Sequence, residues 1–293
     1  MINSLKRTLL MEWIDANCPV LWSLLNIQAK KTLPRGLIEY SGGGIEIERF
    51  EHNLKPVENV LIDLEDLCGS KSLGDAYRRD FSRVNSGNQV WELFCEISVC
   101  CSLGKIADGK KLTLRPPTGK GTYSDCLLKI QGFSIYAEVK RYVDPWPPIY
   151  ELGSTCHKEI PNKRSICITN EKPNDTVRPR VMDLKSKLLD LNRQFPDRGI
   201  NILFVFHPSL GESQRYLTQA FFGEANFFAK HNYILNEDGL FSKEEWRIIS
   251  ACCFSYFNPF NSNVVFQYVW ENPRAYIGLP KIVLDEFHKM RQH

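Results

Sequence analysis

Two carboxylates and a lysine are spaced along this sequence so that two neighbouring strands would bring them together. Asp125 stands at the start of a short apolar segment, and Glu138 and Lys140 stand near the end of the next one. Side chains of a strand alternate between its two faces, so Glu138 and Lys140 share one side. If Asp125 begins the antiparallel neighbour of that strand, all three groups converge on one point. Such a cluster suits a divalent metal ion and an activated water, the equipment for cutting a phosphodiester bond.

The acid-x-Lys spacing alone is common, because a chain of average composition contains about one or two such triplets by chance. This chain has three, and the other two are Asp108-Gly109-Lys110 and Asp183-Leu184-Lys185. The first is expected on a glycine turn and the second on a helix, so only 138–140 combines a strand with an acid upstream. The simpler alternative is a surface ion pair between Glu138 and Lys140, which would stabilise the fold little.

The elements that must position these residues form one continuous series. Helices are expected over 88–103 and 183–195, and strands over 111–115, 126–130, 133–141 and 201–206. Gly104 is expected to end the first helix, since glycine is a common helix stop. The face of the third strand opposite Glu138 should pack, because it carries the apolar side chains Phe133, Ile135, Ala137 and Val139.

The regions on either side are expected to extend this central series. Before it, helices are expected over 9–25 with a break at Pro19, over 57–68 and over 73–82, and a Gly42–Gly44 turn could join short strands near Ile38 and 45–47. After it, a helix over 213–230 and a hairpin within 246–257 and 264–270 are expected, although Ser242 with Glu245 could instead cap a helix at the start of the first segment. The chain therefore divides into 1–85, a mainly helical extension, 86–210, the core with a long loop at 145–180, and 211–293, which packs on the core.

Composition places the chain among ordinary globular proteins. Its 293 residues are 43% hydrophobic and 24% charged, enough to bury a core without covalent staples. The formal net charge of +3 permits nucleic-acid binding without arguing for it. The ten cysteines include no Cys-x-x-Cys pair, and no apolar run is long enough to span a membrane. We therefore expect a cytoplasmic protein with reduced thiols and no membrane partner.

Four short stretches resemble a known family. They are Trp91-Glu92-Leu93-Phe94, Gly104, Ser124-Asp125 and Ala137-Glu138-Val139-Lys140. Their types and order resemble the core of the PD-(D/E)XK nuclease superfamily, over the middle of the chain. The resemblance implies an α/β protein with a restriction-endonuclease-like core, in which a mixed sheet is flanked by helices. The helical N-terminal part and the β-containing C-terminal part would then be extensions of that core.

The resemblance also implies roles for individual residues. Asp125 and Glu138 would bind the metal ion, with Mg²⁺ as the cofactor and Mn²⁺ as a substitute, and Lys140 would orient or help activate water. Glu92 matches the acid of the preceding helix and would support the metal, with Glu96, one turn later on the same face, held in reserve. Ser124 stands where the family has proline, a residue that shapes the start of the strand and does no chemistry. The implied activity is hydrolysis of nucleic acid, with DNA as the leading substrate, and a homodimer is one expected form.

Three readings of function remain open from the residues. If the nuclease fold holds, nucleic-acid phosphates would suit a basic set in the long loop, which consists of Lys163, Arg164, Arg178 and Arg180. Solvated loop charge explains the same set equally well. A second hypothesis is a nucleic-acid-binding or scaffold protein on the same fold without hydrolysis. A third is an unrelated enzyme that uses Cys156 or His157 of the loop.

Overall fold

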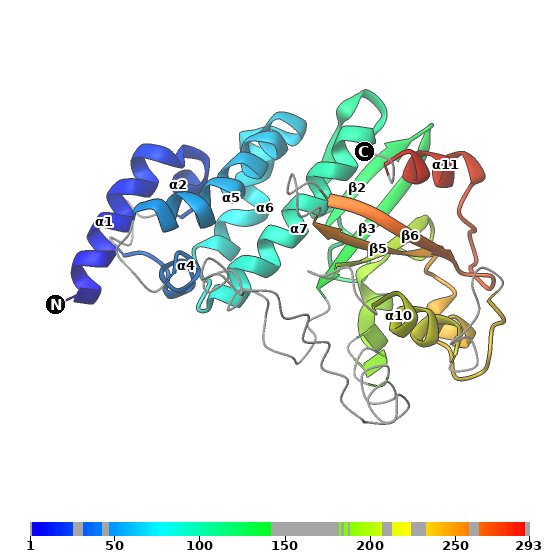
Figure 1. The fold of residues 1–293 in the computed structure, drawn as a ribbon. Helices are drawn as coiled ribbons and strands as arrows, with labels where there is room; N and C mark the ends of the chain where they lie inside the picture. The colour runs from blue at the N-terminus through cyan, green and yellow to red at the C-terminus, as the bar shows by residue number, and fades with distance from the viewer. Residues whose placement is uncertain are drawn as a thin grey trace, which may run out of the picture.

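A computed structural model describes residues 2–25, 32–42, 47–141, 182, 185–186, 188–206, 213–223, 233–257 and 264–290. Helices gather at the N-terminal end of the molecule and the sheet lies at the other end (Figure 1). The α/β class expected from the sequence is confirmed. No helix within these ranges combines the length and the apolar character that a membrane crossing requires.

Six strands form one mixed sheet, and they are ordered in the sheet as they are along the chain. The strands are β1 (Leu112–Leu114), β2 (Cys126–Ile130), β3 (Phe133–Arg141), β4 (Ile200–Phe206), β5 (Ala251–Phe257) and β6 (Val264–Glu271). Neighbours in β1–β2–β3 and in β5–β6 are antiparallel, whereas β3, β4 and β5 run parallel. Asp108 fixes the turn between β2 and β3 by accepting hydrogen bonds from the Gln131 and Gly132 N–H groups.

Both faces of the sheet are covered, which explains why β4 is buried throughout and apolar except at Asn201. Ile202 and Phe204 share a core with α7 (Gly87–Ile106) and α11 (Lys281–Lys289). Leu203 and Val205 point the other way and share a second core with α10 (Ser213–Phe222). Three short 3₁₀ helices, η2 (Leu189–Gln194), η4 (Leu240–Ser242) and η5 (Glu244–Trp246), contribute to this second core. A fourth, η1 (Asp108–Lys110), precedes β1.

The N-terminal helices pack into the same core as the α7 side of the sheet. They are α1 (Ile2–Asn17), α2 (Pro19–Leu25), α4 (Arg35–Tyr40), α5 (Ile47–Cys68) and α6 (Ser70–Phe81). Pro19 divides α1 from α2 as predicted, because proline is well tolerated at the first position of a helix. Buried Glu58 caps α2, since its carboxylate oxygens accept hydrogen bonds from the Val20 and Leu21 N–H groups at 3.0 and 2.9 Å.

Gly104 does not end its helix, contrary to the prediction, because α7 continues to Ile106. The glycine is buried against α5, and a Cβ at this position would lie 2.7 Å from Leu67 Cδ1. Gly104 therefore permits a close approach of two helices and does not form a turn.

Several expected boundaries are corrected by tertiary packing. Ile38 lies in α4 and Ile47 begins α5, so neither belongs to a strand, because the neighbouring Leu37 and Phe50 pack into the helical core. The segment expected as a strand from Trp246 begins instead at Ala251, after η5. Within 183–195 the described element is the 3₁₀ helix η2. The helix α11 was not expected from the sequence.

Candidate functional site

The backbone of β2 and β3 brings Asp125 beside Glu138, as the sequence predicts. Cys126 pairs with Ala137, so Asp125, which directly precedes β2, lies opposite Glu138. The Asp125 N–H donates to the Ala137 carbonyl at 3.0 Å and extends the ladder by one residue. Ile135, Ala137 and Val139 pack into the core with α7, as expected for that face, while Phe133 at the strand end stays exposed.

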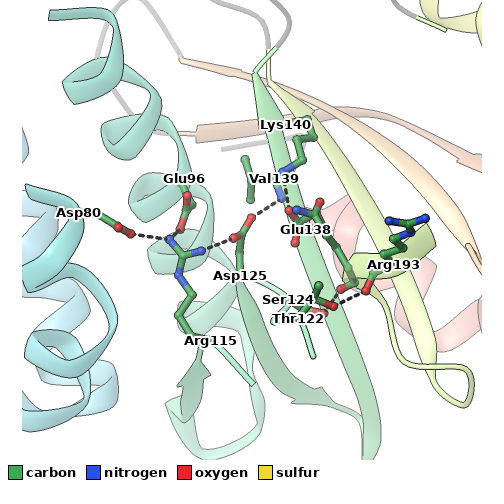
Figure 2. A network of polar contacts seen from close by, with 11 residues as sticks. Asp80, Glu96, Arg115, Thr122, Ser124, Asp125, Glu138, Val139, Lys140 and Arg193 are labelled. Atoms are coloured by element: carbon green, nitrogen blue, oxygen red, sulfur yellow. Dashed lines mark hydrogen bonds and ion pairs between the residues drawn. The ribbon is translucent and has the colours of Figure 1, made fainter. Parts of the chain in front are cut away.

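Asp125 is held on both sides of its carboxylate. Its Oδ2 accepts a hydrogen bond from the Val139 N–H at 2.7 Å, and its Oδ1 lies 3.3 Å from Arg115 Nη1 (Figure 2). The residue is only 3% exposed. A charged group at this depth requires such partners, because burial of an unpaired carboxylate is costly.

Glu138 and Lys140 form an ion pair on one face of β3. Lys140 Nζ lies 2.6 Å from Glu138 Oε1, and Glu138 is 1% exposed, whereas a third of the Lys140 side chain is accessible. The second oxygen of Glu138, Oε2, is buried without a hydrogen-bond partner in the described structure. The surface ion pair weighed as the simpler alternative does not describe this pair, since its acid lies in the interior.

Of the two acids on α7, the structure brings Glu96 to the cluster. Glu96 Oε1 lies 2.7 Å from Arg115 Nη2. Glu92, favoured from the sequence, is exposed one turn earlier and lines a surface pocket of about 330 Å³ that also reaches Glu96 and Arg115. Both acids therefore face the same pocket, but Glu96 belongs to the network that includes Asp125.

Arg115 is the residue that sequence reasoning missed. It follows β1 directly, and its guanidinium also lies 3.2 Å from Asp80 on α6 and 5.2 Å from the centre of the Tyr77 ring. Its backbone adopts a left-handed φ of +49°, a conformation that costs a non-glycine residue about 1–3 kcal/mol. No sequence signal marks this turn of the backbone, which aims the side chain at Glu96 and Asp125.

Ser124 fixes the start of β2 in place of the expected proline. The residue is fully buried, and its hydroxyl donates to the Gln194 carbonyl at 2.5 Å. Two residues earlier, the Thr122 hydroxyl donates to the Arg193 carbonyl (Figure 2). These two bonds tie the segment before Asp125 to carbonyl groups of η2.

The pKa values of the three buried acids are raised above their ordinary values. Burial raises the pKa of Glu138 to about 8, and the Asp125 charge adds to the shift against the opposing Lys140. Burial and the Asp125 charge raise the pKa of Glu96 to about 8 in the same way, against Arg115. Burial also raises the pKa of Asp125, although Arg115 and Lys140 oppose it. The positive charges of Arg115 and Lys140 therefore do not offset the effect of burial and mutual repulsion on these three carboxyls.

The donor set fits a hard divalent cation in chemistry, since Mg²⁺ prefers carboxylate oxygens. The orphaned, buried Oε2 of Glu138 supplies one such oxygen without breaking a contact. Across the described ranges, however, no three His, Cys, Asp or Glu side chains are grouped as they would be around a metal ion. The carboxylates are instead paired with Arg115 and Lys140.

The remaining sequence candidates lie outside the described residues. They are the basic set Lys163, Arg164, Arg178 and Arg180 and the loop pair Cys156 and His157. Comparison with known proteins adds no relative: no protein-family model matches the chain, and no curated protein or solved structure matches it significantly.

Proposed function

We propose that this chain is a metal-dependent nuclease that hydrolyses phosphodiester bonds of nucleic acid, with DNA as the leading substrate. One observation carries the proposal. Two buried carboxylates from paired strands, Asp125 and Glu138, lie beside the partly accessible Lys140, and one Glu138 oxygen has no partner among the described residues. A fold that needed only stability would gain from an apolar residue at such a position.

Each residue has a role that follows from its position. Asp125 and Glu138 would hold Mg²⁺, or Mn²⁺ in its place, with Glu96 beside them. When bound, the ion lowers the pKa of a water and offsets the charge on a phosphate. Lys140 is a compact ammonium that reaches solvent at the edge of the cluster, so it can hold the attacking water or the scissile phosphate.

The chain topology supports the same proposal. The helix α7 is followed by the antiparallel series β1–β2–β3, and β4 then joins β3 in parallel. This order and these directions agree with the restriction-endonuclease-like core that the sequence resemblance implies. In this proposal Asp125 and Glu138 keep the roles that the resemblance implies, and Glu96 would take the role first expected of Glu92 on the helix.

A second candidate is a nucleic-acid-binding or scaffold protein that keeps the fold and lacks hydrolysis. The observation that favours it is the pairing of the acids with Arg115 and Lys140, with no ligand group formed around a common centre in the described part of the chain. For either candidate, the basic loop set is the proposed contact to phosphates, and a cytoplasmic location and a homodimer remain proposals.

Calorimetric titration of Mg²⁺ and Mn²⁺ into the purified protein separates the two candidates. The nuclease proposal expects binding that is lost in Asp125→Asn and kept in Asp63→Asn. Asp63 is a matched control because it also pairs with a cation, Lys105 at 2.6 Å, but on the exposed surface. Absence of metal binding, with and without a DNA duplex, together with tight DNA binding would overturn the nuclease proposal in favour of the binding protein.

A further inference from the structure

Arg115 places a fixed positive charge inside the acidic cluster. Its two terminal nitrogens contact Asp125 at 3.3 Å, Glu96 at 2.7 Å and Asp80 at 3.2 Å (Figure 2). These acids come from three different elements, namely the start of β2, α7 and α6. The guanidinium is therefore the only side chain in Figure 2 that joins the helical part of the network to the strand part.

The position of Arg115 is fixed by more than its ion pairs. Its backbone N–H donates to the Asp125 carbonyl at 3.0 Å, so the two residues face each other at the end of the β1–β2 ladder. The guanidinium also packs over the Tyr77 ring, a contact that favours a cation. Arginine forms a rigid planar fork, so these contacts hold its charge in one place.

The contacts leave few oxygens for a metal ion. Asp125 Oδ1 and Glu96 Oε1 face Arg115, Asp125 Oδ2 accepts from the Val139 N–H, and Glu138 Oε1 pairs with Lys140. Two carboxylate oxygens of the cluster are buried without a hydrogen bond in the described structure, Glu96 Oε1 and Glu138 Oε2, and Arg115 Nη2 lies 2.7 Å from the first of them. The oxygen that could take a metal ion without breaking a contact therefore lies on the Glu138 side of Asp125, and Arg115 already serves the Glu96 side.

We propose that Arg115 takes the place of a second metal ion, so that the cluster holds one divalent ion, between Asp125 and Glu138. This inference rests on the proposed nuclease function. Formal charge agrees with it: when all groups are ionised, the four carboxylates of Asp80, Glu96, Asp125 and Glu138 and the two cations leave −2 in the cluster. One divalent ion would bring that total to zero, whereas a second ion would leave an excess of two positive charges.

The test is the stoichiometry of Mn²⁺ binding, measured by calorimetry and by electron paramagnetic resonance on the full chain. The wild type should bind one ion, with the hyperfine pattern of isolated Mn²⁺. Arg115→Met removes the charge and should admit a second, weaker ion, with the magnetic coupling expected for ions about 3.5–4 Å apart. Arg115→Lys keeps a charge and should still bind one ion.

The possible failures are distinguishable. Two ions in the wild type would overturn the role of Arg115 and leave the nuclease proposal standing, and this result does not depend on whether a variant folds. One unchanged ion in a folded Arg115→Met protein would also overturn it. No ion in the wild type, even with a DNA duplex present, would overturn the nuclease proposal itself.

Discussion

Within the described residues, carboxylates are buried in two places, and the surrounding groups compensate the negative charge differently in each. Glu58 is fully buried, and its two oxygens accept from the Val20 and Leu21 N–H groups at the start of α2, where a helix favours negative charge. Glu138 is buried almost as fully, but only one of its oxygens is paired, with Lys140. The first carboxylate is a satisfied part of the fold, whereas one oxygen of the second has no hydrogen-bond partner in the described structure.

The difference separates structural acids from acids with another task. Backbone N–H groups satisfy Glu58 without any other charged group, so folding alone accounts for it. Glu138 lies beside Asp125, whose charge helps to raise the Glu138 pKa to about 8 after burial, the larger cause. Repulsion of this kind destabilises the folded chain, and perturbed acids of this kind cluster at functional sites.

The largest expected effect is the loss of cleavage in Glu138→Gln. The rate should fall by about 1,000-fold, or about 4 kcal/mol, because the metal loses a charged ligand. Glu286→Gln is the matched control, since Glu286 pairs with Lys289 at 2.7 Å on α11, away from the cluster. Rates of plasmid cleavage measure the effect. Equal rates in the two variants would mean that Glu138 contributes no more to cleavage than a surface acid does.

The next effect concerns stability and should appear only at the structural acid. Glu58→Ala leaves the Val20 and Leu21 N–H groups buried without their acceptor, which should lower the free energy of unfolding by about 3 kcal/mol. Urea denaturation measures this change. Glu138→Gln should lower the free energy of unfolding less in the same experiment, because it removes the repulsion from Asp125 and leaves unpaired only Lys140, whose side chain is one third accessible to water. A larger loss of stability in Glu138→Gln than in Glu58→Ala would mean that Glu138, and not Glu58, is the structural acid.

A third effect is the pH dependence of stability in the metal-free protein. The pKa values of Glu96 and Glu138 are raised to about 8 in the fold by burial and by the Asp125 charge, so the folded chain holds protons that the unfolded chain releases. Stability should therefore fall as pH rises from about 6 to about 8, by roughly 2 kcal/mol if one proton is involved. Thermal melts over this range check the slope, which Glu138→Gln should reduce. Stability that rises with pH, or a pH dependence that is unchanged in Glu138→Gln, would contradict the raised pKa values of these acids.

The smallest effect sharpens the choice between the two acids of α7. Glu96→Gln should reduce cleavage by about 10–100-fold, the usual cost of removing a group that supports a metal site. Glu92→Gln should reduce it less, because Glu92 is exposed and lies one turn away. Initial cleavage rates at saturating Mg²⁺ compare the two variants. A larger loss of rate in Glu92→Gln would mean that Glu92, and not Glu96, supports the metal.

The sequence predicted best where one strong pattern decides the structure. Strands β2 and β3 begin and end at the predicted residues, because alternating side chains and a tight turn leave little choice of register. The pairing expected of these strands already places Asp125, Glu138 and Lys140 together. The break at Pro19 was predicted for a similar reason, since proline restricts the backbone by itself.

The rest depended on tertiary geometry that no local pattern records. Glu92 and Glu96 share a helix face. The position of α7 along its axis, relative to β2, decides which of them reaches Arg115. Arg115 was expected as the last residue of a strand. Its backbone is instead left-handed, and its side chain contacts three acids of the network. Gly104 resembled a helix stop, but it lies inside α7, close to the Leu67 side chain of α5.

The central claim is tested most directly by incubating the purified protein with plasmid DNA in the presence of Mg²⁺ and, in parallel, of a chelator. Asp125→Asn and its surface control Asp63→Asn belong in the same experiment. The account predicts cleavage by the wild type and by Asp63→Asn, with loss on chelation and in Asp125→Asn. Cleavage that persists in Asp125→Asn, or that ignores the chelator, would contradict it.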